Sequence, residues 1–384
     1  MSRAPEHPIL TGLHPAAQAG VGFEPLPAVY GSWIDELIGP VPREGRAQCS
    51  ECPMCATAGV ASETKPFHPS AKCCTYVPEL PNYLVGAALA EESSPNGHLS
   101  LEIRIRHQTA VTPLGVGVVP MLRLAYEAVA EQAFGASDAL RCPHYDESGA
   151  GSCGIWKHRN AECATWFCRH VRGRIGAELW AALRAFLKAV EAALSAWAAL
   201  EAGLPSRELL RCLAYRRLAA AERLSVELVR GWDGTRSELW GTLAGREREF
   251  FASTAAKVRP LSLTDVLEVC GAEGRAAAEG VRLAFAQTAC TDLPSRLRLA
   301  PLRVLSTDGL VATVATYGRF DTLGIATDLL HALLAGGPLA LADAVRLAGR
   351  DDSVRGLAAV RMLVDHGVLV ESHADPRTTP IGRT

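Results

Sequence analysis

The stretch "RCPHYDESGAGSCGIWKHRNAECATWFCRH" (residues 141–170) places four cysteines in one short run of the chain. Two cysteine motifs precede it, "CSECPMC" at residues 49–55 and the adjacent pair in "KCCTYVPELPNYLVG" at residues 72–86. Nine of the twelve cysteines of the protein therefore fall between residues 49 and 168. We expect the other three, Cys212, Cys270 and Cys290, to be ordinary buried side chains of helices.

The composition of the 384 residues excludes several classes of protein. A formal net charge of −2 gives no global basic surface for nucleic acid or for a membrane. The N-terminal "MSRAPEHPILTGLHPAAQAG" lacks the apolar core of a secretory signal, and no apolar run reaches the roughly 18 residues of a membrane span. We therefore expect a cytoplasmic protein, in which twelve cysteines do not indicate a disulfide framework.

The cysteine spacing is typical of metal binding. A C-x₂-C turn bends two thiolates toward one centre, and "CSECPMC" contains two such steps that share Cys52. Interleaved histidines, His144, His158 and His170, could replace or supplement a thiolate, although a hydrogen-bonding or surface role is the more common one. The predicted ligands are Cys49, Cys52, Cys55, Cys73, Cys74, Cys142, Cys153, Cys163 and Cys168.

Two kinds of centre suit this set of thiols. Eight cysteines could form two Cys₄ zinc sites with one cysteine to spare, two iron–sulfur cubanes, or one cubane beside a zinc or iron ion. Three thiols within seven residues favour a cluster of several irons, and we predict one or two 4Fe–4S clusters with zinc as the alternative. Nearby cations would offset the negative charge of the thiolates: Lys157, Arg159, Arg169, Arg172 and Arg174.

The same motifs resemble the YkgJ-type cysteine-cluster proteins, which are described as zinc- or iron-chelating domains. The later half of that family pattern matches here as Cys142-Pro143, "CGIW" at 153–156, Arg159 before Cys163, and Phe167-Cys168. The resemblance covers about 120 residues, with Asn160 and Ala164 in place of the usual proline and arginine. Some members, including a flagellin lysine methylase, carry the domain as part of an enzyme, so the resemblance implies metal binding and leaves catalysis open.

The next feature is the direction in which the adjacent side chains of Cys73 and Cys74 point. Successive side chains of an extended segment point to opposite sides. We therefore expect the two thiols to face different metal centres or different irons, and to join the "CSECPMC" half of the domain to the later half.

The hydrophobic pattern predicts a mainly α (α+β) protein in four parts. These are an irregular N-terminal arm (1–48), the cysteine-rich domain (49–172), a helical domain (173–300) and a small C-terminal module (301–384). Within them we predict a half-buried strand over 98–111, an amphipathic helix over 121–134, a long helix over 176–202 and another from Ser206 to about Arg230. Breaks are expected at "GWDG" (231–234) and "RPLS" (259–262).

The C-terminal module has the order of a winged helix. A hairpin with the turn Asp308-Gly309 is followed by three predicted helices, at about 321–335, 339–348 and 353–366, and by the strand "VLVE". This order resembles PqqD-like modules, which hold a leader peptide in peptide-modification pathways, so the resemblance implies a peptide or protein partner. DNA is a poor alternative, because Asp351 and Asp352 precede a helix with few cations; a purely structural cap is another.

No motif assigns a reaction. The sequence contains no Walker A motif, dinucleotide fingerprint, H-E-x-x-H or radical-SAM spacing. Two hypotheses remain: a redox or peptide- or protein-modifying enzyme whose substrate docks on the C-terminal module, and a non-catalytic interaction scaffold with structural metal sites.

Overall fold

The computed structural model describes a defined part of the chain, and three predicted ligands, Cys49, Cys52 and Cys168, lie outside it. So do the expected break at 231–234 and the lone Cys290. The described residues are 26–42, 55, 67–91, 95–118, 123, 126, 128–129, 133–148, 151–167, 170, 172–219, 236–289, 292–317, 322–350 and 352–372.

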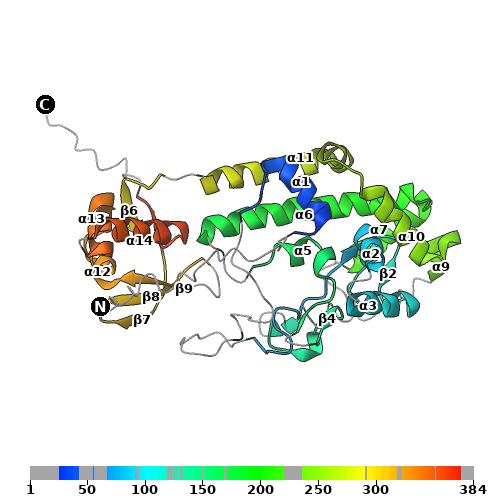
Figure 1. Cartoon of the computed structure of the whole chain (residues 1–384), viewed down its shortest axis with the longest axis horizontal. Helices are drawn as coiled ribbons and strands as arrows, with labels where there is room; N and C mark the ends of the chain where they lie inside the picture. Colours follow the sequence, from blue (N-terminus) through cyan, green and yellow to red (C-terminus); the bar gives the residue numbers. More distant parts are fainter. Residues whose placement is uncertain are drawn as a thin grey trace, which may run out of the picture.

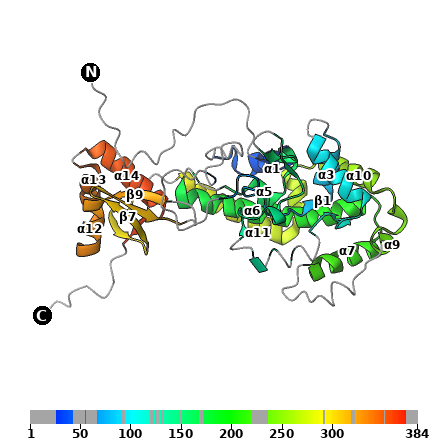
Figure 2. The same cartoon turned by 90° about the horizontal axis from the view of Figure 1, so that it is seen from below.

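The long helix α6 (Gly173–Glu201) runs through the middle of the molecule (Figures 1 and 2). Its 29 residues span about 44 Å at 1.5 Å per residue. Leucines recur on one face at helical spacing, and Leu179, Leu183 and Leu187 are buried. The predicted helix is confirmed, and the chain turns away at Gly203, whose φ of 89° favours glycine.

The main core forms where two other helices pack on α6. Helix α11 (Leu263–Ala289) lies along it, and α1 (Ala28–Ile38) lies on α11. Tyr30 and Trp33 of α1 are buried in this core. The expected irregular arm is therefore wrong for residues 28–38, because the apolar side chains of this short segment repeat at helical spacing and cover the core.

A second core gathers at the opposite end of α6 from the C-terminal module (Figure 1). Gly86 of α2 touches the main chain of α10, since an added Cβ would meet the oxygen of Phe251 at 1.9 Å. A small antiparallel sheet in the order β1-β3-β2 covers this region. Its elements are β1 (Leu80–Pro81), α2 (Asn82–Leu89), α3 (Pro95–Arg106), β2 (Val111–Thr112), β3 (Gly115–Val116), α7 (Ser206–Ala219), α9 (Arg236–Trp240) and α10 (Glu247–Val258).

The strand predicted over 98–111 is wrong. Residues 95–106 form helix α3, with Leu101 and Arg104 buried while Leu99 and Ile103 are largely exposed. Leu99 and Ile103 are apolar but exposed. With the buried Leu101 between them, they produce an alternation of apolar and polar residues like that of a strand. Of the predicted segment only its last residue, Val111, lies in a strand, β2.

Other predicted elements of the middle region agree with the structure. In the segment 121–134 the described residues Arg123, Tyr126, 128–129 and Ala133 are helical, while Phe134 lies in a turn. The break at 259–262 separates α10 from α11, and Ser206 begins α7 as expected. Residues 220–235 lie outside the described part, so the predicted end of that helix is not among them.

The C-terminal module contains the predicted hairpin. Strands β7 (Val304–Asp308) and β8 (Val311–Ala315) pair antiparallel around Gly309. The first predicted helix is partly wrong, because 322–326 form a third strand, β9, that pairs with β8. Its β-branched and small residues fit a pleated surface better than a helix. The remaining elements are β6 (Arg296–Leu299), α12 (Thr327–Gly336), β10 (Leu339–Ala340), α13 (Leu341–Gly349), α14 (Ser353–Asp365) and β11 (Leu369–Glu371).

The fold is therefore mainly α with small sheets, as predicted, while the winged-helix assignment stays a prediction. None of the described helices is both long and apolar enough to cross a membrane. The start of α6 meets the end of α14: Gly173 has φ of 55°, and an added Cβ would lie 2.7 Å from the oxygen of Asp365. This close approach ties the C-terminal module to the central helix.

Candidate metal centre

Five predicted ligands from four separate segments come together in the structure. They belong to the turn at 69–75, the loop before β4 (Tyr145–Asp146), β5 (Ser152–Cys153) and the short helix α5 (Ala161–Ala164). Their thiols are close enough to interact electrostatically. The charges of Cys153, Cys142 and Cys73 raise the pKa of Cys163. Those of Cys153 and Cys142 raise the pKa of Cys74. We call this group the five-thiol cluster: Cys73, Cys74, Cys142, Cys153 and Cys163.

Main-chain contacts hold these segments together. The nitrogen of Cys142 donates to the oxygen of Cys74 at 2.7 Å, and Tyr145 pairs with Cys153 across β4 and β5. At the start of α5, the side-chain oxygen of Asn160 accepts from the nitrogen of Cys163 at 3.0 Å. The segments are thus positioned by the backbone and by one helix cap.

The Cys73–Cys74 pair does not have the expected arrangement. It lies in a turn rather than an extended segment, following Lys72 at φ of 53°. The Cys74 thiol donates a hydrogen bond to the sulfur of Cys73, so the two side chains meet. The prediction that they point to opposite sides is wrong, because the turn brings successive side chains together.

The environment shifts the pKa values of the thiols strongly. The hydrogen bond from Cys74 lowers the pKa of Cys73, and the same bond raises that of Cys74. Burial raises the pKa of Cys142 to about 12, and it also raises the pKa values of Cys153 and Cys163. Because most of these thiols hold their protons, a metal that binds here must displace them.

Buried cations surround the five-thiol cluster. Arg159 is 7% exposed, lies 3.4 Å from the ring centre of Trp156, and lowers the pKa values of Cys153 and Cys163 through its charge. The sequence predicted this arginine. Lys72, which donates to the oxygen of Gly151 at 3.0 Å, and Arg104, whose charge acts on Cys142, are buried as well.

Lys72 and Arg104 were missed in the sequence. Adjacency to the cysteine pair could have indicated Lys72, but no local signal places Arg104 of α3 beside Cys142. The other predicted cations pair with carboxylates: Lys157 with Glu91, Arg172 with Asp365 and Arg174 with Glu178, while Arg169 lies outside the described residues.

The three candidate histidines differ in their surroundings. His158 contacts Glu91 at 3.0 Å, and His170 contacts Tyr317 at 3.0 Å. His144 is 2% exposed, and its Nδ1 lies 2.7 Å from the hydroxyl of Ser100. Burial lowers the pKa of His144 to about 3, with the charge of Arg104 adding to the effect.

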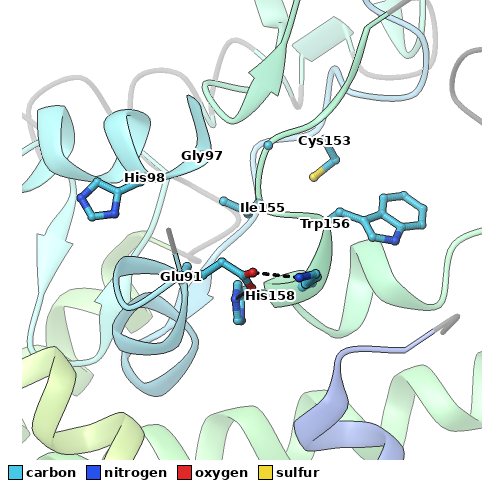
Figure 3. Close-up of a pocket in the computed structure, with 10 residues that line it drawn as sticks. Glu91, Gly97, His98, Cys153, Ile155, Trp156 and His158 are labelled. Carbon is cyan, nitrogen blue, oxygen red and sulfur yellow. Dashed lines mark hydrogen bonds and ion pairs between the residues drawn. The ribbon is translucent and has the colours of Figure 1, made fainter. Parts of the chain in front are cut away.

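A pocket of about 170 Å³ opens beside the cluster. Figure 3 shows Cys153 on one wall, with Gly97 and His98 of α3 on another and Glu91 and His158 near its base. Gly154 allows α3 to approach, because an added Cβ would lie 2.9 Å from the nitrogen of Gly97. Cys153 is the cysteine of the cluster that lines this pocket.

The five thiols suit a thiolate-bound metal centre in residue type and number, but not yet in arrangement. No group of three or more His, Cys, Asp or Glu side chains in the described ranges is arranged to hold a single metal ion. Of the remaining predicted ligands, Cys55 is described and half-buried, while Cys49, Cys52 and Cys168 fall outside those ranges. As predicted, Cys212 is buried in the second core and Cys270 packs on the main core.

No protein-family model, curated protein or solved structure matches this chain. The resemblances to the YkgJ-type proteins and to PqqD-like modules therefore stay predictions from sequence motifs.

Proposed function

We propose that this protein binds an iron–sulfur cluster on the cysteines of residues 49–172. The observation that supports it is the gathering of Cys73, Cys74, Cys142, Cys153 and Cys163, all half-buried, from four segments into one group. Several thiols from separate segments, with cations beside them, are the arrangement that a thiolate-bound metal centre requires. A 4Fe–4S cluster takes one ligand per iron, so it can use at most four of these five thiols, and a fifth is spare or belongs to a second centre.

The buried cations support a charged centre. A cluster with several thiolates carries negative charge, which is costly to bury without compensation. Arg159 beside Cys153 and Cys163, and Arg104 beside Cys142, supply that compensation. Such charges also tune the reduction potential of an iron–sulfur cluster.

We further propose that the protein acts on a peptide or protein. The pocket at Cys153 gives small molecules or a substrate side chain a route to the centre. In the C-terminal module β7 is an edge strand of the described sheet β7-β8-β9, and its Val304 is exposed. An extended peptide can add to such an edge through main-chain hydrogen bonds. A cluster that supplies or accepts an electron would then make the chain a redox or modifying enzyme.

Anaerobic purification of the full chain tests cluster binding. Iron, acid-labile sulfide and zinc are measured per chain, together with the absorbance spectrum. We expect about four irons and four sulfides for each 4Fe–4S cluster, with broad visible absorption that bleaches on reduction.

The alternative is a non-catalytic scaffold with structural zinc. About two zinc ions per chain, with neither iron nor sulfide, would overturn the iron–sulfur proposal and favour this scaffold. A chain that contains none of these elements would rule out both. Cluster content with no electron transfer to small oxidants or reductants would separate a structural cluster from a redox-active one.

A further inference from the structure

His144 lies between two cysteines of the five-thiol cluster. Its main-chain nitrogen donates to the sulfur of Cys142, and its carbonyl oxygen accepts from the nitrogen of Gly154 at 2.8 Å, next to Cys153. The charge of Arg104 lowers both the pKa of the Cys142 thiol and the pKa of the His144 ring. The main chain of His144 therefore lies beside both cysteines, and its buried ring has Ser100 and Arg104 as neighbours.

The hydrogen bond at Nδ1 fixes which nitrogen of His144 carries the proton. The Ser100 hydroxyl donates its hydrogen to the oxygen of Gly97 at 2.7 Å. In its 2.7 Å contact with His144 the hydroxyl must then accept, so Nδ1 carries the hydrogen. A neutral imidazole with its hydrogen on Nδ1 has its lone pair on Nε2.

That lone pair has no hydrogen-bond partner in the described part of the chain. Nε2 is fully buried, and the histidine as a whole is 2% exposed. A histidine whose Nδ1–H is held by a neighbouring oxygen while Nε2 is bare has the arrangement of a metal ligand with its supporting hydrogen bond.

We infer that Nε2 of His144 is a nitrogen ligand of the metal centre, with Ser100 as the residue that orients it. This inference rests on the proposed function, and it names one ligand that is not a thiolate. A neutral nitrogen donor in place of a thiolate makes the centre less negative and raises its reduction potential. It also explains why a histidine occupies a buried position among cysteines and beside an arginine.

Pulsed electron paramagnetic resonance of the reduced, anaerobically purified full chain tests this ligand directly. Protein with unlabelled histidine and protein with ¹⁵N-histidine are compared. We expect a strong hyperfine coupling to one nitrogen that changes with the label. On a zinc-loaded chain, X-ray absorption should show one Zn–N distance of about 2.0–2.1 Å among Zn–S distances of about 2.3 Å.

Variants identify which histidine is responsible. His144→Ala should abolish the nitrogen coupling, and His144→Cys should restore metal content with a lower reduction potential. Ser100→Ala should weaken or change the coupling, because the ring loses its orienting partner. His158→Ala is the matched control, since its imidazole contacts Glu91, and it should leave the coupling unchanged.

The outcomes separate this inference from the proposed function. A metal-loaded wild-type chain with sulfur ligands only, or a coupling that persists in His144→Ala, would overturn the inference and leave cluster binding intact. A wild-type chain that binds neither iron nor zinc would overturn both. The wild-type spectra decide the matter even where a variant fails to fold. A buried water or anion shared by Nε2 and the unpaired Nη1 of Arg104 would give the sulfur-only result.

Discussion

The hydroxyl of Tyr30 donates a hydrogen bond of 2.5 Å to Oε1 of Glu191, inside the main core. The main-chain nitrogen of Ala161, which begins α5, donates to the same oxygen at 2.6 Å. One carboxyl of α6 therefore joins α1 to the short helix that carries Cys163. The position of a cluster thiol depends on this buried contact.

Glu191 should make the stability of the protein depend on pH. Burial raises its carboxyl pKa from 4.5 to about 7, so the folded protein holds a proton that the unfolded chain releases between these values. The stability that this group contributes is full below about pH 4.5 and is lost as pH rises through about 7. The loss amounts to roughly 3 kcal/mol, at 1.36 kcal/mol per pKa unit.

The variant Glu191→Gln tests this dependence. The amide oxygen can accept from Tyr30 and Ala161 but does not ionise. In urea unfolding, we expect the variant to exceed the wild type in stability at pH 8 and to match it near pH 4.5. If the free energies of unfolding of the two proteins change in parallel between pH 4.5 and pH 8, Glu191 is not the group responsible.

Loss of a cluster cysteine should remove metal, whereas loss of a cysteine elsewhere should not. Cys142→Ala and Cys163→Ala each delete a thiol of the five-thiol cluster, and Cys49→Ala or Cys52→Ala deletes a predicted ligand. We expect each to lose most of its iron. Cys212→Ala is the control, because that thiol is buried in the second core. Metal analysis measures the effect, and equal iron in all five variants would show that the ligand set is wrong.

Arg159 should stabilise the bound centre through its charge. Its guanidinium lowers the pKa values of Cys153 and Cys163, which must be thiolates to bind metal. We expect Arg159→Gln to weaken metal binding by about tenfold or more, and to lower the reduction potential of the cluster. Competition with a chelator gives the affinity.

Lys157→Gln is the matched control for Arg159. Its ammonium is two-thirds exposed and pairs with Glu91. Its loss should therefore change neither the metal affinity nor the reduction potential measurably. If both variants weaken binding equally, the effect is one of general charge and not of Arg159.

Gly86 should tolerate no side chain. The methyl group of Gly86→Ala would meet the carbonyl oxygen of Phe251 at 1.9 Å, so α2 and α10 must separate. We expect a destabilisation of about 1–3 kcal/mol. Gly280→Ala, in α11 with nothing within 4 Å of the new methyl, should instead stabilise by up to about 1 kcal/mol. Thermal unfolding compares them, and equal effects of the two variants would contradict the close approach.

Local periodicity correctly predicted the helices whose apolar pattern extends over several turns. The leucine face of α6 and the residues around Ser353 of α14 gave the correct helices, because burial on one side repeats over several turns. The pattern failed in α3, where Leu99 and Ile103 stay exposed and imitate a strand. It also failed in α1, whose helix is short and whose surroundings contain many prolines.

The spacing of the cysteines predicted that they would gather, but it did not predict their surroundings, and their role as ligands stays a prediction. Cysteine spacing predicted the five thiols that the structure gathers. The proximity of Arg104 and the orientation of His144 depend on how α3 packs against β4 and β5, which no short stretch of sequence encodes. The turn at Cys73 and Cys74 reversed a prediction, because Lys72 adopts a positive φ that its residue type does not indicate.

The bond between the nitrogen of Cys142 and the oxygen of Cys74 has a consequence for assembly. It involves no thiol, and neither does the pairing of Tyr145 with Cys153. The backbone can therefore bring the sulfurs together in a newly made chain before any metal arrives. Under the proposed function, metal would then be loaded late, onto a framework that the backbone has already formed.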